Sequence, residues 1–107
     1  MNDADGKSET ELREVLCDAG RILERGGQGD FCMGHVTLRL PDNPGRMLMK
    51  AAAMGFDEMT PSNIVTIDME GEKVAGTHKR HNEVYIHTEI MRNRPEIRSV
   101  VHTHAPY

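Results

Sequence analysis

The sequence predicts a single domain in which helices pack on a mostly antiparallel sheet, as an α+β or an α/β/α layered fold. Apolar residues recur with a helical period in two separate segments, and short runs rich in β-branched and aliphatic residues lie between and after them. These elements do not follow the regular alternation of a parallel sheet. Because no repeat, low-complexity tract or linker divides the chain, residues 1–107 are taken as one domain.

The first helix is expected to begin at Ser8 and to end at Gly26. Ser8 followed by Glu11 is a capping-box pattern, and the apolar residues that follow have helical spacing: Leu12, Val15, Leu16, Ala19, Ile22 and Leu23. Residues 35–40 then predict a strand, 41–45 a turn rich in Pro, Asp, Asn and Gly, and 46–49 the returning strand of a hairpin.

The second half of the chain predicts a similar mixture. Residues 60–61, a threonine followed by a proline, suit the start of a short helical turn. Residues 64–69 predict a strand that turns at 70–71, with 74–75 pairing back. A helix is expected from residue 82 to residue 94, where Pro95 prevents it from continuing.

Residues 98–104 predict a last strand that carries two histidines, His102 and His104. Residues two apart in a strand project from the same face, so both imidazoles can bind one metal ion. Two surface or hydrogen-bonded histidines are the alternative. A catalytic zinc site uses three protein ligands and an open position, so this pair is half a site.

Glu83 lies in the first turn of the helix that leads into this strand, where its carboxylate can meet the two imidazoles. The alternative is a helix-start acid that interacts favourably with the helix dipole. His87, four residues later on the same helix face, is expected to orient Glu83 or simply to pack. His78 and His81 lie in a polar connection and are expected to be solvated.

Composition excludes several classes of function. The formal net charge of -4, without a basic stripe, gives no electrostatic footprint for nucleic acid and disfavours anionic membranes. The polar, acidic amino terminus lacks a signal-peptide core, and no apolar run approaches a membrane span. We therefore expect a cytoplasmic protein whose Cys17 and Cys32 are reduced thiols.

Five segments, in this order and spacing, resemble the class II aldolase/adducin family: residues 34–39, 60–71, the segment around Glu83, 94–96 and 100–107. The resemblance implies an α/β/α layered domain with a mainly antiparallel central sheet, similar to fuculose-phosphate aldolase. It also implies that residues 1–107 are an apparently truncated, N-terminal part of that domain, because the family's third histidine ligand lies well beyond the His-x-His pair. In this family the enzyme is usually a homotetramer with its site at a subunit boundary.

By the same resemblance, His102 and His104 bind a divalent metal, usually zinc and sometimes manganese or another ion, and Glu83 is the catalytic acid. The implied reaction is cleavage of a carbon–carbon bond in a small oxygenated substrate through a metal-stabilised enolate, as in aldolases, decarboxylases and some epimerases. Near neutral pH, Glu83 needs either a pKa raised by burial or the metal as partner. A segment of 107 residues alone is expected to be inactive.

Two differences between this sequence and the sugar-phosphate aldolases bear on which substrate is bound. Those enzymes carry an asparagine where this sequence has His35 and a Ser-Gly phosphate loop where it has residues 50–55, with Lys50 followed by three alanines. We therefore expect a carboxylate rather than a phosphate on the substrate, contacted by His35, Thr37 and Lys50. The alternatives are an exposed strand end for Lys50 and an ordinary hydrogen-bonded sheet residue for His35.

Two other functions remain open from sequence. One is a non-catalytic assembly domain, as in adducin, and the other is an inactive truncated remnant that folds as its own oligomer. A scaffold needs no metal ligands or acid, so the joint presence of Glu83, His102 and His104 favours the enzyme.

Overall fold

The computed structural model describes residues 8–27 and 34–103. Their helices are α1 (Glu9–Arg25), the short 3-10 helix η1 (Phe56–Glu58) and α2 (Val84–Asn93); their strands are β1 (His35–Leu40), β2 (Asn43–Met49), β3 (Val65–Asp68), β4 (Lys73–Ala75) and β5 (Ser99–His102). Within these two stretches, no helix has the length and apolar character needed to cross a membrane.

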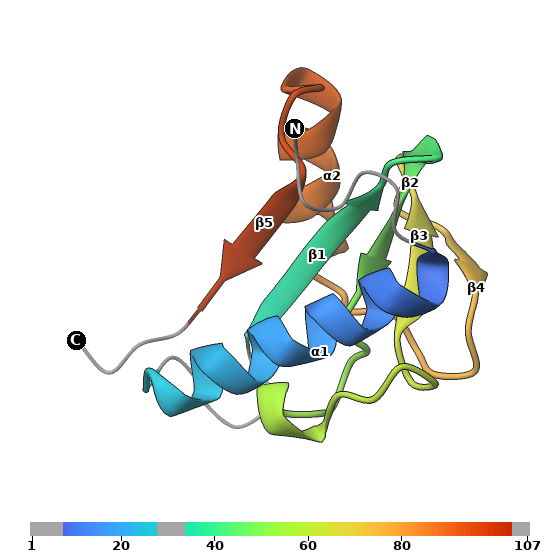
Figure 1. Ribbon diagram of the computed structural model, residues 1–107. Coiled ribbons are helices and arrows are strands. Elements are labelled where there is room, and N and C mark those ends of the chain that lie inside the picture. Colours follow the sequence, from blue (N-terminus) through green and yellow to red (C-terminus); the bar gives the residue numbers. More distant parts are fainter. Residues whose placement is uncertain (1–7, 28–33, 104–107) are drawn as a thin grey trace.

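The strands form one sheet in the order β4-β3-β2-β1-β5, and each neighbouring pair is antiparallel (Figure 1). The predicted hairpin is the β1–β2 pair, and the last strand of the sequence returns to the other side of β1. In the described part of the chain β5 is an edge strand, and Val101 on it is 50% exposed.

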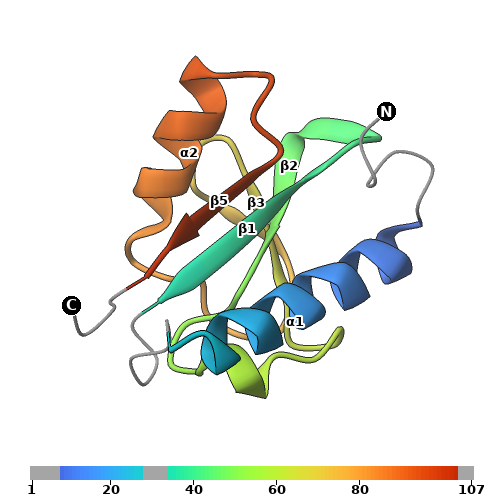
Figure 2. The same ribbon diagram turned by 60° about the vertical axis from the view of Figure 1, so that its left-hand side comes forward.

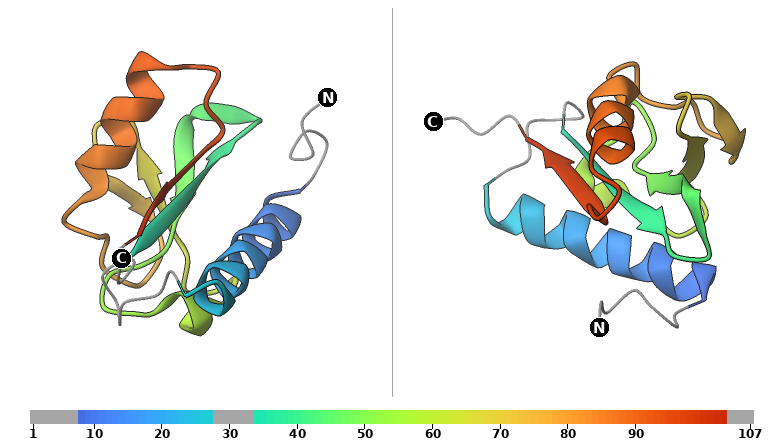
Figure 3. Two further views of the ribbon diagram at one scale, coloured as in Figure 1. Left: turned by 90° about the vertical axis from the view of Figure 1, so that its left-hand side faces the viewer. Right: turned by 90° about the horizontal axis from the view of Figure 1, so that it is seen from above.

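The two long helices lie on opposite faces of the sheet (Figures 2 and 3). Helix α1 packs in an apolar cluster with alternate residues of β1: Leu12, Leu16, Cys17, Val36, Leu38, Leu40, Leu48, Phe56, Met59 and Ile64. Helix α2 packs in the second cluster, on the opposite face: Met47, Met49, Ala51, Met54, Val65, Ile67, Val84 and Met91. The predicted α/β/α layered domain with a mainly antiparallel sheet is therefore confirmed.

Helix α1 is fixed at its start and along its side by polar contacts. The Ser8 hydroxyl accepts a hydrogen bond from the Glu11 N–H, and the Glu11 carboxylate accepts one from the Ser8 N–H, which completes the predicted capping box. Arg13 donates from Nη1 to the carbonyl oxygens of Pro61 (2.8 Å) and Ile64 (3.2 Å). The helix is thereby tied to the segment that enters β3.

Residues 60–63 form the short turn predicted there, closed by a hydrogen bond from the Asn63 N–H to the Thr60 carbonyl oxygen. The Asn63 side chain also accepts from the Thr60 N–H. Two predicted strand boundaries differ from the structure. Strand β2 starts within the predicted turn. Strand β5 is the described part of the strand predicted over 98–104; His104 lies outside the described residues.

Gly20 of α1 lies close to η1, and its replacement tests this packing. A Cβ at Gly20 would lie 2.7 Å from the Phe56 carbonyl oxygen and 2.7 Å from Met59 Sδ. We expect Gly20→Ala to lower the free energy of unfolding, because overpacking of about 1–3 kcal/mol exceeds the roughly 1 kcal/mol gained in helix propensity. Chemical denaturation measures the change.

Gly26→Ala is the matched control. Gly26 has a φ of -79° and its added Cβ meets no atom closer than 3.4 Å, so stability should stay within about 0.5 kcal/mol of the parent. A Gly20→Ala protein as stable as the control would show that α1 and η1 are not in close contact.

Candidate active site

The His35 imidazole is the centre of a histidine cluster on the α2 face of the sheet. Its side chain is fully buried, and its ring centroid lies 4.6 Å from those of His81, His87 and His102. The rings of His35 and His102 are almost parallel, at 8°. They meet because the antiparallel register of β1 and β5 places these two residues directly opposite each other.

A chain of hydrogen bonds runs from His35 into the protein. Nδ1 of His35 contacts Nε2 of His87, and Nδ1 of His87 lies 2.8 Å from the Thr37 hydroxyl. Thr37 is two residues after His35 and therefore on the same face of β1, while His87 is on the buried side of α2. From sequence, His87 was expected either to orient Glu83 or to pack. The structure shows that it is buried and contacts His35 and Thr37.

Glu83 meets this chain at its outer end. It is the residue before α2, and its Oε1 lies 3.2 Å from Nε2 of His35. Its side chain is 46% exposed. Glu83 makes no side-chain hydrogen bond to the start of α2, so the contact with His35, and not capping of the helix, orients the carboxylate.

Burial and hydrogen bonding determine the charges of these groups. Burial lowers the pKa of His87 to about 3 and that of His35 to about 4, and the nearby His81 and His102 act in the same direction. The hydrogen bond from His35 lowers the pKa of Glu83. Of the two ways to tune Glu83 considered from sequence, a pKa raised by burial is opposed by this direction, and the metal as partner stays a prediction.

The donor atoms of His35, His81 and Glu83 lie within 4.8 Å of one another, and this group can hold a metal ion. Two imidazoles and a carboxylate are donor types that suit zinc and related divalent ions, so the chemistry of this place fits a divalent metal. The ligands predicted from sequence, His102 and His104, are not members of this group. The expectation that His81 is solvated is wrong, because its ring lies partly buried against His35.

The predicted ligand pair is described only in part. His102 lies at the end of β5 beside His35, whereas His104 is outside the described residues. The pair therefore stays a prediction, and the structure brings His102 and Glu83 to the same buried imidazole, His35.

Lys50 lies apart from this cluster. It is fully buried, so its expected exposure at a strand end is wrong. Its ammonium donates to the carbonyl oxygens of Ala51 (3.4 Å) and Met54 and lies 5.7 Å from the centre of the Phe56 ring, which belongs to the cluster under α1. The structure therefore brings His35 and Thr37 together at the site and places the Lys50 ammonium on the α1 face of the sheet.

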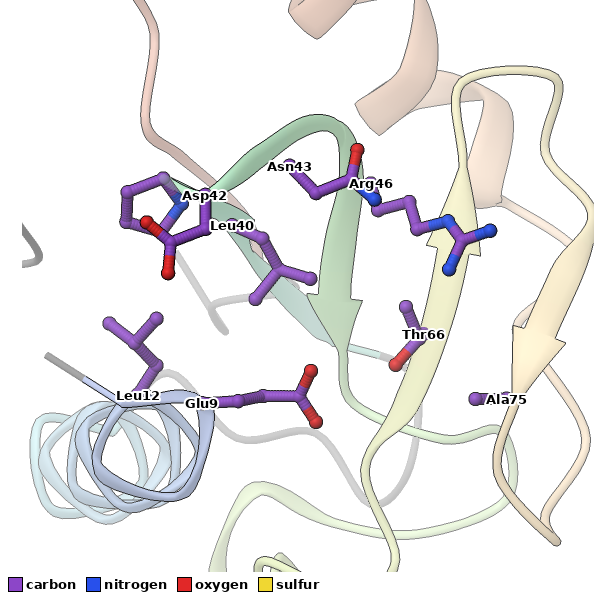
Figure 4. Close-up of a pocket in the computed structure, with 9 residues that line it drawn as sticks. Glu9, Leu12, Leu40, Asp42, Asn43, Arg46, Thr66 and Ala75 are labelled. Atoms are coloured by element: carbon purple, nitrogen blue, oxygen red, sulfur yellow. The ribbon is translucent and has the colours of Figure 1, made fainter.

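A pocket of about 210 Å³ lies between the start of α1 and the β1–β2 turn, and Figure 4 shows Glu9 extending into it toward Thr66. None of the residues that line it belongs to the histidine cluster. Glu9 is already paired with Arg13 at 3.1 Å. The pocket therefore adds no reactive group to the site.

The sequence is similar to a known family of proteins over most of its length. The sequence profile of the class II aldolase and adducin N-terminal domain matches residues 14–107, and the chain belongs to this family. The chain is 33% identical to a 3,4-dihydroxyphthalate decarboxylase of Arthrobacter keyseri, over 88% of the chain and 40% of that protein. It is 34% identical to a 5-methylthioribulose-1-phosphate/5-deoxyribulose-1-phosphate aldolase of Rhodospirillum rubrum, over 90% of the chain and 42% of that protein.

Solved structures have the same architecture. An L-fuculose 1-phosphate aldolase from Glaciozyma antarctica PI12 superposes with a TM-score of 0.86 at 29% identity, over 92% of the chain and 42% of that protein. The fuculose-aldolase-like fold expected from sequence is confirmed. The chain spans about two fifths of the length of these relatives.

The buried histidines predict a pH-dependent stability. His35 and His87 have pKa values of about 4 and about 3 in the folded protein and about 6.5 when unfolded. The unfolded chain therefore binds more protons between these values. The stabilisation that the neutral rings contribute is fully present above about pH 6.5. It is lost as the pH falls toward 4, and the free energy of unfolding decreases by up to about 1.4 kcal/mol per proton per pH unit.

Urea unfolding at several pH values, with chelator present, measures this slope. His87→Gln should reduce the slope by about one proton, whereas His78→Gln should leave it unchanged, because His78 is exposed. Equal slopes in the parent and His87→Gln would mean that His87 is not buried as a neutral ring.

Proposed function

We propose that this chain is part of a divalent-metal-dependent lyase that cleaves a carbon–carbon bond, of the aldolase or decarboxylase type. The observation that carries the proposal is the Glu83 carboxylate held at 3.2 Å by the buried His35, with His81 and His102 against the same ring. The relatives named as aldolase and decarboxylase support the same class of reaction. An assembly domain has no need of this buried cluster.

Glu83 is the proton-transfer residue in this proposal. Its lowered pKa keeps it ionised at neutral pH, so it enters the reaction as a proton acceptor. Its partly exposed carboxylate is accessible to a substrate, while the buried His35 fixes its orientation from behind. The same carboxylate can later return the proton to the product.

His102 and His104 would hold the metal, with Glu83 beside them, and zinc is the ion that these donors suit best. When bound, a divalent ion supplies a Lewis acid that stabilises the negative charge developing on a substrate oxygen as the adjacent bond breaks. The part of the protein beyond this chain would supply the remaining ligand.

The substrate is proposed to be a small oxygenated molecule that carries a carboxylate. In the loop of residues 50–55 the Lys50 ammonium is directed to backbone carbonyls, and no hydroxyl side chain is available for a phosphate. His35 and Thr37 are fully buried, so they are proposed to support the substrate site from behind Glu83 and not by direct contact with the substrate. A cytoplasmic homotetramer is the proposed state of the whole protein.

Metal content tests the ligand assignment. The intact protein should contain about one divalent ion per chain, and the double variant His102→Ala/His104→Ala should lose it, because a three-ligand site cannot hold the ion with two ligands removed. Elemental analysis of dialysed protein measures the ratio. His78→Ala, at an exposed histidine, is the control; equal metal in the double variant and the control would refute the assignment.

Turnover tests the role of Glu83. Glu83→Gln in the intact enzyme should lower kcat by about 10²-fold or more, because a general base contributes on that scale, while the fold is retained. The control is Glu89→Gln, an exposed acid on the same helix, which should leave kcat unchanged. If Glu83→Gln turns over at the rate of the control, the proton acceptor is another residue.

A further inference from the structure

We infer that Thr37 and His87 are positioning residues, which fix the His35 ring with its Nε2–H directed at Glu83, and that His35 acts beside the metal site as a hydrogen-bond donor and not as a metal ligand. The inference deepens the proposed function, since it rests on Glu83 being the reacting carboxylate. The three groups, His35, His87 and Thr37, are buried, and each ring nitrogen of the two histidines has one hydrogen-bond partner in this assignment.

The contacts form one continuous line of polar atoms. Glu83 Oε1 faces His35 Nε2 at 3.2 Å, His35 Nδ1 faces His87 Nε2, and His87 Nδ1 faces the Thr37 hydroxyl at 2.8 Å. His35, His87 and Thr37 are each fully buried or nearly so. In the described part of the chain every buried polar side-chain atom has a hydrogen-bond partner, the atoms of this line included.

The charge at one end determines the direction of every hydrogen bond. An ionised carboxylate only accepts, so His35 must carry its proton on Nε2. A neutral ring has one N–H, which leaves His35 Nδ1 as an acceptor and requires the proton of His87 on Nε2. His87 Nδ1 then accepts from the Thr37 hydroxyl.

The geometry around Thr37 agrees with this direction. Its single hydroxyl hydrogen has two possible acceptors, His87 Nδ1 at 2.8 Å and the Val100 carbonyl oxygen at 3.5 Å. The shorter contact is the one that the direction of the chain requires. Burial lowers the pKa of both rings, which supports their neutral state even with His81 and His102 against the cluster.

This arrangement removes His35 from the possible metal ligands. Both of its ring nitrogens are engaged in hydrogen bonds. Of His35, His81 and Glu83, whose donor atoms lie within 4.8 Å of one another, His35 therefore has no lone pair directed at an ion. Outer hydrogen-bond partners of this kind orient a reacting or ligating group, and their loss typically reduces metal affinity or activity by about 10- to 100-fold.

Nuclear magnetic resonance on the intact, chelator-treated protein with ¹⁵N-labelled histidine tests the assignment. Long-range ¹H–¹⁵N spectra show which ring nitrogen is protonated, and the His35→Gln and His87→Gln variants assign the signals. Both rings should be Nε2–H tautomers at pH 7.5. A protonated Nδ1 on His35 would overturn the inference, whatever the protein catalyses.

Thr37→Val and Thr37→Ser form the matched pair. Valine keeps the volume and removes the donor to His87, so the His87 signals should shift toward the other tautomer, with kcat reduced about 10-fold or more and KM little changed. Serine keeps the hydroxyl and should restore both. Unchanged tautomers in folded Thr37→Val would show that Thr37 and His87 do not position His35.

Metal content separates the two possible roles of His35. His35→Gln should retain most of the metal, in contrast to the double variant of His102 and His104. If His35→Gln is as depleted of metal as that double variant, His35 is a ligand and the inference fails. If the parent protein holds no metal, the proposed function fails, while the tautomer measurement still decides the positioning role.

Discussion

The polar side of β1 is the constraint on which the arrangement of this domain depends. Alternation along the strand directs Val36, Leu38 and Leu40 to the cluster under α1, and His35, Thr37 and Arg39 to the face covered by α2. All three polar side chains are buried, and buried polar groups are costly without partners. Helix α2 and strand β5 supply these partners, so their positions are set by polar contacts as well as by apolar packing.

Arg39 fixes the other end of this arrangement. Its guanidinium donates to the carbonyl oxygens of Met91 (2.8 Å) in the last turns of α2, Ile97 (2.9 Å) before β5 and Pro44 (2.9 Å) in the hairpin. Each such bond contributes about 1 kcal/mol or somewhat more, but its geometry is specific. With Arg39 holding the end of α2 and His87 bonded to Thr37, the start of α2 is brought to His35. Glu83 therefore reaches the site because the whole helix is aligned with β1.

Most of the local structure was predictable from sequence, since it depends on local patterns. The Ser8 capping box, the β1–β2 hairpin and the stop at Pro95 each depend on neighbouring residues. The short turn that begins at Thr60 is local in the same way, because Asn63 closes it with both its backbone N–H and its side chain.

The site was predictable only where chemistry and family resemblance pointed to it. Glu83 and His102 were selected, and both contact His35. The central position of His35 depends on the register of β1 against β5, which joins residues far apart in sequence and leaves no local pattern. The burial of Lys50 and the contact of His81 with His35 were missed for the same reason: tertiary partners, here backbone carbonyls and another ring, override the ordinary preference of polar side chains for solvent.

The asymmetry of burial along the polar chain explains how Glu83 keeps its charge. Glu83 is close to half exposed, whereas His35 and His87 are fully buried. Burial opposes a positive charge on either ring, so the contact with His35 is a hydrogen bond from a neutral donor and not an ion pair. A neutral donor lowers the pKa of the carboxylate without giving it a proton to share. The carboxylate thus faces solvent while its orientation is set from inside the protein, which is the arrangement that the proposed base requires to act at one point on a bound molecule.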